Sequence, residues 1–354
     1  MTTLLKNFFT AALIASGAVS VNAQDSAAVS PLQISGSVDT YYKYDFSGYK
    51  PGNIPTAFAS ENNSLSLGMI DLALKKSSGK ASFVGEVSFG PRGQYQSLPN
   101  SDNTYEEGNG YNSFHIQNLY ASYQFTEKFS MTAGYMGTFV GYEVISPVGN
   151  FNYSTSYLFS NGPFQNAGIK ANYAFSDKVG LMVGLFNDWN VYQDFNGVSD
   201  FGAQLFLSPV EGWSAYVNFI TGYPSGTEID LTTSYQLTES FKLGLNVADM
   251  SRPSDAGGFS GGALYLQNAF SPTVSLGVRG EYFKSKKNEA LVFGPVADES
   301  VFALTFSGNV KAGPLTVIPE VRFDNGSVDM FYKKNGVDMT KSAAQFSIAA
   351  VYAF

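Results

Sequence analysis

Strict alternation between two kinds of side chain, sustained over residues 32–45, is the feature of this sequence that most constrains its fold. One face of the segment carries apolar, small and aromatic side chains: Leu32, Ile34, Gly36, Val38, Thr40, Tyr42 and Tyr44. The other face carries mostly polar ones: Gln33, Ser35, Ser37, Asp39, Tyr41, Lys43 and Asp45. A period of two residues indicates a β-strand. The segment is longer than a typical globular strand and long enough for a tilted crossing of a membrane.

The same alternation recurs to the end of the chain. The segments expected to form strands are residues 32–45, 64–76, 80–90, 114–125, 129–139, 166–175, 179–189, 199–208, 213–222, 227–237, 241–250, 260–270, 274–285, 298–310, 314–324 and 342–354. These make sixteen, and an even number suits a closed antiparallel barrel with both chain ends on one side of the membrane. The predicted fold class is therefore all-β, a transmembrane antiparallel barrel.

Two of these strands have an ambiguous register. Leu65 and Leu67 are out of phase with Ile70, so either a β-bulge lies near residues 68–69 or the assumed register is wrong there. In residues 260–270 two alternatives stay open for the outward face: Leu264 with Leu266, or Tyr265 with Ala269.

The connections between strands support a barrel independently. Short polar connections alternate with long ones, and the long ones lie near residues 46–63, 91–113, 140–165, 286–297 and 325–341. Outer-membrane barrels show this asymmetry, with short periplasmic turns and longer external loops. A soluble β-sandwich gives no reason for every second connection to be short.

The first 23 residues have the pattern of a secretory signal. Lys6 supplies the positive charge, residues 8–19 are largely apolar, and residues 21–23 form a small-residue cleavage site before Gln24. The apolar run is too short for a transmembrane anchor and is followed by polar residues. We therefore expect a signal peptide over residues 1–23 and a single barrel domain over residues 24–354.

Composition excludes several classes of function. Without Lys6 the chain has 20 basic and 29 acidic residues, a net charge of −9, which argues against nucleic-acid binding. There is no cysteine, which excludes disulfides, thiolate catalysis and zinc–thiolate sites. No spacing typical of metal ligands and no phosphate-binding glycine loop is present, so no metal or cofactor is predicted.

Five short motifs resemble those of a known family. They are Gly134 to Glu143 (GYMGTFVGYE), Tyr153 to Tyr157 (YSTSY), Asn187 to Asn190 (NDWN), Arg279 to Tyr282 (RGEY) and Pro319 to Asp324 (PEVRFD). In this order they resemble the OmpL-like β-barrel porin family, and the likeness extends over essentially the whole chain after residue 23. The resemblance implies a porin in the outer membrane of a Gram-negative cell, without naming a solute.

Charged side chains at inward-facing strand positions are the first candidate for a functional site. Residues 274–285 contribute two and residues 314–324 contribute three: Arg279, Glu281, Glu320, Arg322 and Asp324. Such a wall can polarise the water of a pore and select solutes by charge. Alternatively, the charges pair to stiffen the barrel. The two roles are compatible, and both stay open.

The connection over residues 140–165 is the second candidate. By our count it is the third external loop, and in general porins that loop folds inward and narrows the pore. A constriction would then be lined by Glu143, Asn150, Asn152, Tyr153 and Tyr157. The alternative is an ordinary surface loop.

An enzyme is the rival class. Barrel hydrolases use a histidine beside a serine or an aspartate, and His115 is the only histidine. It belongs to no recognisable motif, so we predict no catalytic residues.

The sequence therefore predicts an outer-membrane porin, embedded in lipid, for passive diffusion of small hydrophilic solutes or ions. The alternative is a non-conducting barrel whose external loops bind a ligand or partner. Sixteen-stranded porins are often homotrimers, but no decisive oligomer signal is present. The alternating C-terminal face, which ends at Tyr352 and Phe354, resembles the signal for the barrel-assembly machinery, so that machinery is a predicted partner.

Overall fold

The computed structural model describes residues 30–90, 92, 114–289, 291 and 293–354. The predicted signal peptide over residues 1–23 lies outside the described residues, as does most of the predicted connection over residues 91–113. Within the described part, no helix is long and apolar enough to cross a membrane.

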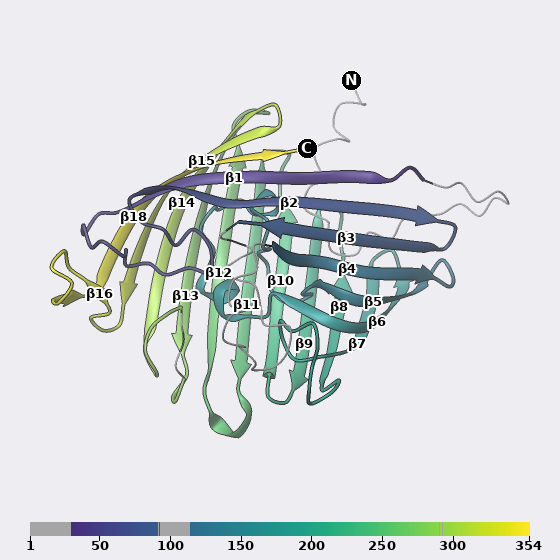
Figure 1. Cartoon of the computed structure of the whole chain (residues 1–354). Helices are drawn as coiled ribbons and strands as arrows, with labels where there is room; N and C mark the ends of the chain where they lie inside the picture. The colour runs from purple at the N-terminus through teal and green to yellow at the C-terminus, as the bar shows by residue number, and fades with distance from the viewer. Residues whose placement is uncertain (1–29, 91, 93–113, 290, 292) are drawn as a thin grey trace.

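The described chain forms a closed antiparallel barrel of sixteen strands, which confirms the predicted fold class. Figure 1 shows the strands side by side around the wall, with the first strand next to the last. The barrel strands are β1 (Gln33–Asp45), β2 (Ser64–Ser78), β3 (Ala81–Phe89), β4 (Phe114–Gln124), β5 (Phe129–Gly137), β6 (Gln165–Ser176), β7 (Val179–Phe186), β8 (Asp200–Leu207), β9 (Trp213–Gly222), β10 (Gly226–Gln236), β11 (Phe241–Ser251), β12 (Gly258–Ala269), β13 (Val274–Ser285), β14 (Ser300–Ala312), β15 (Leu315–Gly326) and β18 (Ser342–Ala353). Each predicted strand corresponds to one of them, with ends that agree to within a few residues.

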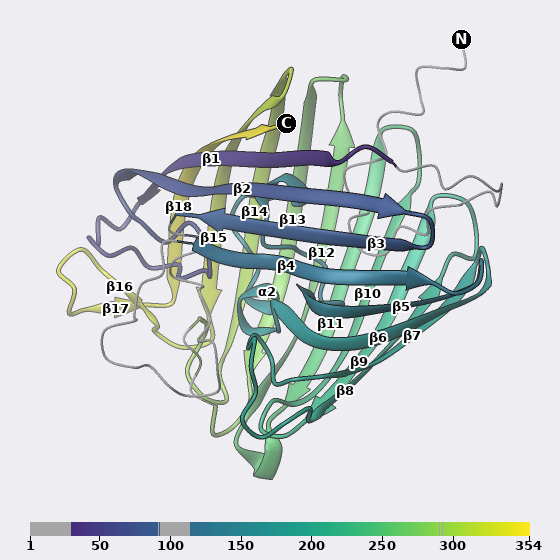
Figure 2. The same cartoon turned by 45° about the vertical axis from the view of Figure 1, so that its right-hand side comes forward.

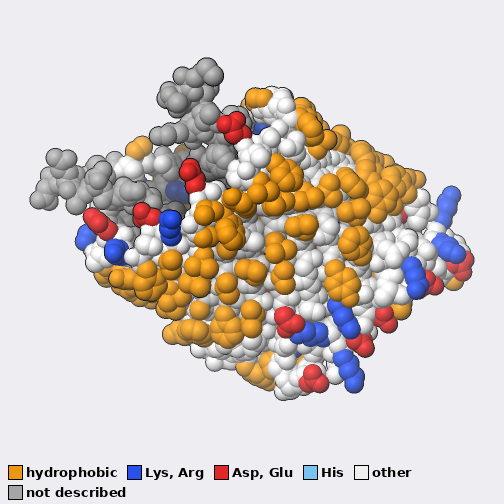
Figure 3. Space-filling view, turned by 180° about the vertical axis from the view of Figure 1, so that it is seen from behind, with side chains coloured by type: hydrophobic (Ala, Val, Ile, Leu, Met, Phe, Trp, Pro, Cys, Tyr) orange, Lys and Arg blue, Asp and Glu red, His pale blue; other side chains and the backbone are white. Residues whose placement is uncertain are grey.

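Alternation along each strand separates a lipid-facing surface from the interior. In β1, Ile34 is 59% exposed, whereas Asp39 and Lys43 are each 2% exposed. In β12, Leu264 is 47% exposed and Tyr265 only 2%, so the first of the two alternatives for this strand is correct at that position. Figure 3 shows apolar side chains spread widely over the outer wall, with most charged side chains near its margins. This is the distribution that a bilayer requires.

Of the two alternatives for residues 64–76, the β-bulge is correct. The pairing of β1 with β2 shifts register between Val38 and Thr40, opposite residues 68–69. Asp39 lies opposite the bulge and accepts a hydrogen bond from the Met69 backbone N–H at 2.9 Å. A side chain at Gly68 would collide with the Asp39 carboxylate. The bulge therefore lets both Leu67 and Ile70 face lipid, at 64% and 47% exposure.

The connections have the predicted asymmetry, with two short exceptions on the external side. The external connection over residues 223–225 is as short as the periplasmic turns, and that over residues 252–257 is only one residue longer than the longest of them, residues 208–212. The loops also hold the 3-10 helices η1 (Pro147–Gly149) and η2 (Pro253–Asp255), the helix α2 (Tyr157–Asn161) and a two-stranded ribbon of β16 (Phe331–Tyr332) and β17 (Met339–Thr340). The ribbon lies in the segment that was expected to be a loop, over residues 325–341.

The C-terminal residue completes the closure of the barrel. Gly36 and Phe354 exchange two backbone hydrogen bonds, each 3.0 Å long. A side chain at Gly36 would contact the ring of Phe354 at 2.8 Å, so only glycine lets the ring lie over this position. The β1–β18 seam thus extends to the last residue of the chain.

Candidate functional site: a loop held inside the barrel

The candidate site is the segment between β5 and β6, residues 138–164, hereafter loop 3. Figure 2 shows its helix α2 within the space that the barrel encloses, and α2 contacts β12 and β13 on the inner wall. Gly141 begins the inward course with a φ of +89°, a conformation that favours glycine. Ser156 caps α2, since its side chain accepts a hydrogen bond from the Phe159 backbone N–H. Local sequence thus provides both the turn and the helix start.

Glu320 on β15 is the first anchor for loop 3. Its carboxylate accepts the backbone N–H groups of Tyr153 at 2.9 Å and Ser154 at 3.1 Å. It also accepts the hydroxyl of Ser307 at 2.7 Å, and that hydroxyl in turn accepts the side-chain amide of Asn152 at 2.7 Å. The carboxylate is 2% exposed, and hydrogen bonds to a charged group contribute about 1.5–3 kcal/mol each.

Glu281 on β13 repeats this arrangement four residues further along loop 3. It accepts the backbone N–H groups of Tyr157 at 3.0 Å and Leu158 at 2.9 Å. Next to it, Arg279 forms an ion pair of 2.6 Å with Glu143 of loop 3. Arg279 also donates to the Ser154 carbonyl at 2.7 Å. The wall therefore binds both backbone N–H groups and a backbone carbonyl of loop 3.

Arg322 and Asp324 on β15 hold the start of α2. Arg322 donates to the Thr155 carbonyl at 2.8 Å and pairs with Asp324 at 2.8 Å. Asp324 accepts the Tyr157 hydroxyl at 2.7 Å, while the Arg322 guanidinium lies 4.8 Å from the centre of the Tyr157 ring. Burial raises the pKa of the Tyr157 hydroxyl well above its ordinary value, so it remains a donor at neutral pH.

A further contact region, on β1, was not predicted from the sequence. Asp39 of β1 accepts the Tyr153 hydroxyl at 2.5 Å and an N–H of Arg92 at 3.4 Å. The Arg92 guanidinium lies 4.4 Å from the centre of the Phe58 ring and 5.4 Å from that of Tyr153. Arg92 follows β3 in a connection, so inward alternation along a strand gave no signal for it.

The first external loop also packs against loop 3. Phe58 lies in this loop, and its ring centre is 5.7 Å from that of Phe159 and 6.1 Å from that of Phe164. Phe159 and Phe164 lie 5.0 Å apart. Such aromatic contacts contribute about 0.5–1.5 kcal/mol beyond the burial of area. Loop 3 is therefore held by apolar packing on one side and by charged hydrogen bonds on the other.

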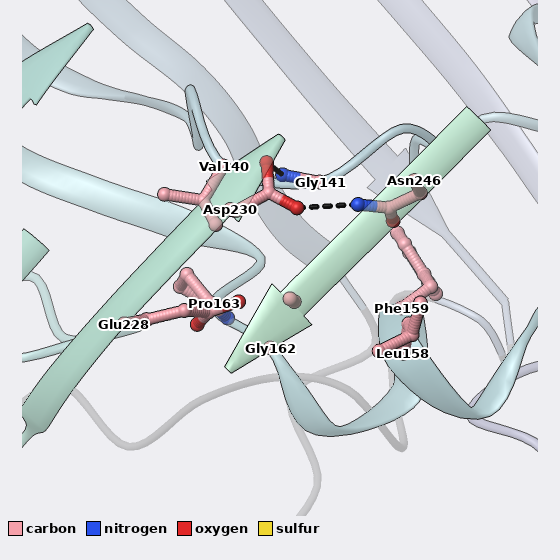
Figure 4. A pocket seen from close by; sticks show the side chains of 10 residues that line it. Val140, Gly141, Leu158, Phe159, Gly162, Pro163, Glu228, Asp230 and Asn246 are labelled. Atoms are coloured by element: carbon pink, nitrogen blue, oxygen red, sulfur yellow. Dashed lines mark hydrogen bonds between the residues drawn. The ribbon is translucent and has the colours of Figure 1, made fainter. Parts of the chain in front are cut away.

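A small pocket separates loop 3 from the opposite wall, as Figure 4 shows. Asp230 on β10 accepts the Gly141 backbone N–H at 3.1 Å and the side-chain amides of Asn218 and Asn246. Glu228 lies two residues away on the same face. Its Oε2 atom is buried without a hydrogen-bond partner among the residues that the structure describes. Loop 3 thus crosses the interior and touches both walls.

The predicted site residues come together with one exception. Arg279, Glu281, Glu320, Arg322 and Asp324 are at most 2% exposed, and all five lie beneath loop 3. Glu143, Asn152, Tyr153 and Tyr157 contact this wall, as described above. Asn150 instead hydrogen-bonds within loop 3, to the backbone of Val144 in both directions. His115 lies in β4, and its side chain is outside the described residues.

These features define a class: a sixteen-stranded outer-membrane barrel of the porin type. Solved porin structures share the fold at low sequence identity. The anion-selective porin from Comamonas acidovorans matches with a TM-score of 0.58 and 13% identity, over 92% of this chain and 99% of that chain. OmpF from Salmonella typhi, in complex with daunomycin, matches with a TM-score of 0.57 and 11% identity, over 91% of this chain and 97% of that chain. OmpT from Vibrio cholerae matches with a TM-score of 0.54 and 12% identity, over 91% of this chain and 97% of that chain.

The family follows from the sequence itself. The model of the family described as "Putative beta-barrel porin-2, OmpL-like" matches residues 31–354. The chain belongs to this family, which confirms the resemblance and the outer-membrane location. No curated protein sequence matches the chain.

Proposed function

We propose that this porin allows passive diffusion of small hydrophilic solutes or ions, and that loop 3 sets the width of the path. The observation that carries the proposal is the attachment of loop 3 to the inner wall through Glu281 and Glu320, each of which binds two consecutive backbone N–H groups. A surface loop without a role in the interior has no need for buried carboxylates as anchors, because water would satisfy its backbone.

The charged wall acts, in this proposal, mainly by positioning loop 3. On β13 and β15 lie two arginines, Arg279 and Arg322, and three carboxylates, Glu281, Glu320 and Asp324, and Glu143 of loop 3 pairs with Arg279. Backbone N–H groups of loop 3 stabilise the excess negative charge at Glu281 and Glu320. The wall charges thus influence solutes through the potential of the interior and through the position of loop 3. No catalytic step is part of the proposal.

Reconstitution into planar bilayers tests the function directly. The purified protein, which should begin at Gln24 after export, is added to a salt-bathed bilayer, and current is recorded at fixed voltage. We expect discrete conductance steps, and steps that come in threes if the protein is a homotrimer, as we also propose. Heat-modifiable migration in gels provides the control for folding. Folded protein that inserts without conductance would support the alternative, a barrel whose loops bind a ligand or partner.

Phe354 provides a test of the proposed recognition by the barrel-assembly machinery. Deleting Phe354 removes both hydrogen bonds to Gly36 and the terminal aromatic ring. We expect a loss of most folded protein from the outer membrane, measured by quantitative immunoblotting of heat-modifiable barrel. The conductance of the remaining barrels should be unchanged, because Phe354 lies 56% exposed at the end of the seam, away from loop 3. Normal assembly of the deleted protein would contradict the role of this residue.

A further inference from the structure

Two external loops and the first residue of β8 bring together a group of oxygen-bearing side chains at the rim of the barrel. One loop, residues 187–199, joins β7 to β8, and the other, residues 223–225, joins β9 to β10. We call the group the rim cluster; its members are Asp188, Asp194, Asn196, Ser199, Asp200 and Ser225. It shares no hydrogen bond with Arg279, Glu281, Glu320 or Arg322, which hold loop 3 to β13 and β15.

Two carboxylates of the rim cluster share one hydroxyl. The Ser199 Oγ atom lies 2.7 Å from Asp188 Oδ1 and 3.3 Å from Asp200 Oδ1. The Ser225 Oγ atom lies 3.4 Å from the same Asp188 oxygen. A hydroxyl has a single proton, so Ser199 cannot donate fully to both carboxylates. The two carboxylates therefore lie close together, and the hydroxyl between them has too few protons to donate to both.

Asp200 shows this shortage most clearly. Its side chain is 0% exposed, and its Oδ2 atom has no hydrogen-bond partner among the described residues. Its other oxygen faces Ser199, so the carboxylate is directed at the cluster. In the described part of the chain no lysine or arginine forms an ion pair with Asp188, Asp194 or Asp200. A buried carboxylate with one oxygen left without a donor is unfavourable as an anion unless the group takes up a proton or a cation lies beside it.

Neutral oxygens complete the surroundings. The Asn196 side-chain amide donates to Asp188 Oδ2 at 3.2 Å and to the Tyr223 carbonyl at 3.1 Å. The Tyr223 carbonyl oxygen therefore lies near the Asp188 carboxylate. Asp194 is already satisfied by the backbone N–H groups of Asp188 and Asn196. Among the described residues, no group of three or more histidine, cysteine, aspartate or glutamate side chains is arranged to hold a metal ion. The donor set is instead two carboxylates with hydroxyl and carbonyl oxygens.

We propose that the rim cluster is a calcium site, formed by Asp188 and Asp200 with the hydroxyls of Ser199 and Ser225. Ca²⁺ accepts carboxylate, hydroxyl and carbonyl oxygens in irregular geometry, at about 2.3–2.6 Å, whereas Mg²⁺ demands a near-ideal octahedron. The ion occupies the place between the two carboxylates that one hydroxyl proton now bridges. It neutralises their charge and ties the loop over residues 187–199 to that over residues 223–225.

Calorimetry with Ca²⁺ tests the site. The full-length barrel, refolded in detergent without lipopolysaccharide, is titrated with calcium chloride. We expect one ion per chain, and at least a tenfold loss of affinity in Asp200→Asn, which keeps the size of the side chain. The control is Asp177→Asn, in the exposed turn between β6 and β7, which should bind like the parent protein. The proposal is overturned if the parent binds no Ca²⁺ at millimolar concentration, or if Asp200→Asn binds equally well.

Limited proteolysis measures the effect of Ca²⁺ binding on the loop over residues 187–199. Phe195 lies within residues 187–199 and is 63% exposed, so it is a target for chymotrypsin. Ca²⁺ should slow cleavage after Phe195, located by mass spectrometry, in the parent and in Asp177→Asn. It should not slow cleavage in Asp200→Asn or, if that variant fails to fold, in Ser225→Ala. Equal cleavage rates of the parent with and without Ca²⁺ would refute the link between the loops.

Discussion

Deleting residues 148–160 should increase the single-channel conductance. The deletion removes the part of loop 3 that crosses to β13 and β15, including both pairs of backbone N–H groups bound by Glu281 and Glu320. A chain segment with its side chains is roughly 10 Å across, a substantial part of the interior of a sixteen-stranded barrel, so we expect a rise on the order of twofold. Step size in planar bilayers, compared with the parent protein, measures the effect.

The barrel should survive this deletion. Its sixteen strands pair with their neighbours independently of loop 3, and the carboxylates that lose their partners become accessible to water. A matched control is the deletion of residues 333–338, the exposed tip of the ribbon formed by β16 and β17, which should leave the step size unchanged. If the variant lacking residues 148–160 is heat-modifiable like the parent and conducts identically, loop 3 does not limit the path.

The wall of the barrel was predictable from the sequence because its physics is local. Each strand must present one face to lipid and one to the interior, so a period of two residues marks its extent and orientation. Even the bulge opposite Asp39 left a signal, as a change of phase between Leu67 and Ile70. The ribbon of β16 and β17 was missed, because two-residue strands are too short to show a period.

The contacts of loop 3 were predictable only in part. Inward charges on β13 and β15 were visible as residues two apart, but their partners were not. Glu143 and Arg279 are 136 residues apart in sequence, and their pairing depends on how far loop 3 reaches across the interior. Arg92 could not be found by periodicity, since it lies outside any strand. Loops follow tertiary contacts, which a single sequence does not record.

Replacing Arg279 with methionine should destabilise the barrel far more than the same change at Arg252. Both arginines pair with a glutamate, Arg279 with Glu143 at 2.6 Å and Arg252 with Glu289 at 2.7 Å. The Arg279 side chain is 0% exposed, whereas that of Arg252 is 43% exposed. Removing one partner of a buried pair leaves an uncompensated charge and lowers the free energy of unfolding by about 3–5 kcal/mol. The Arg252 guanidinium is partly in water, although the Glu289 side chain is only 4% exposed, so water screens this pair and its loss should cost less.

Urea unfolding in lipid vesicles, followed by the fluorescence of Trp189 and Trp213, measures the difference between the two variants. The comparison separates the two roles of the charged wall. If Arg279 anchors loop 3, Arg279→Met should also make the open-channel current noisier, because Glu143 and the Ser154 carbonyl lose their common donor. A double variant, Arg279→Met with Glu143→Gln, should recover part of the lost stability, since the uncompensated charge at Glu143 is then removed. Equal stabilities of the two single variants would show that water reaches Arg279, and that its charge faces the solute path instead of holding the loop.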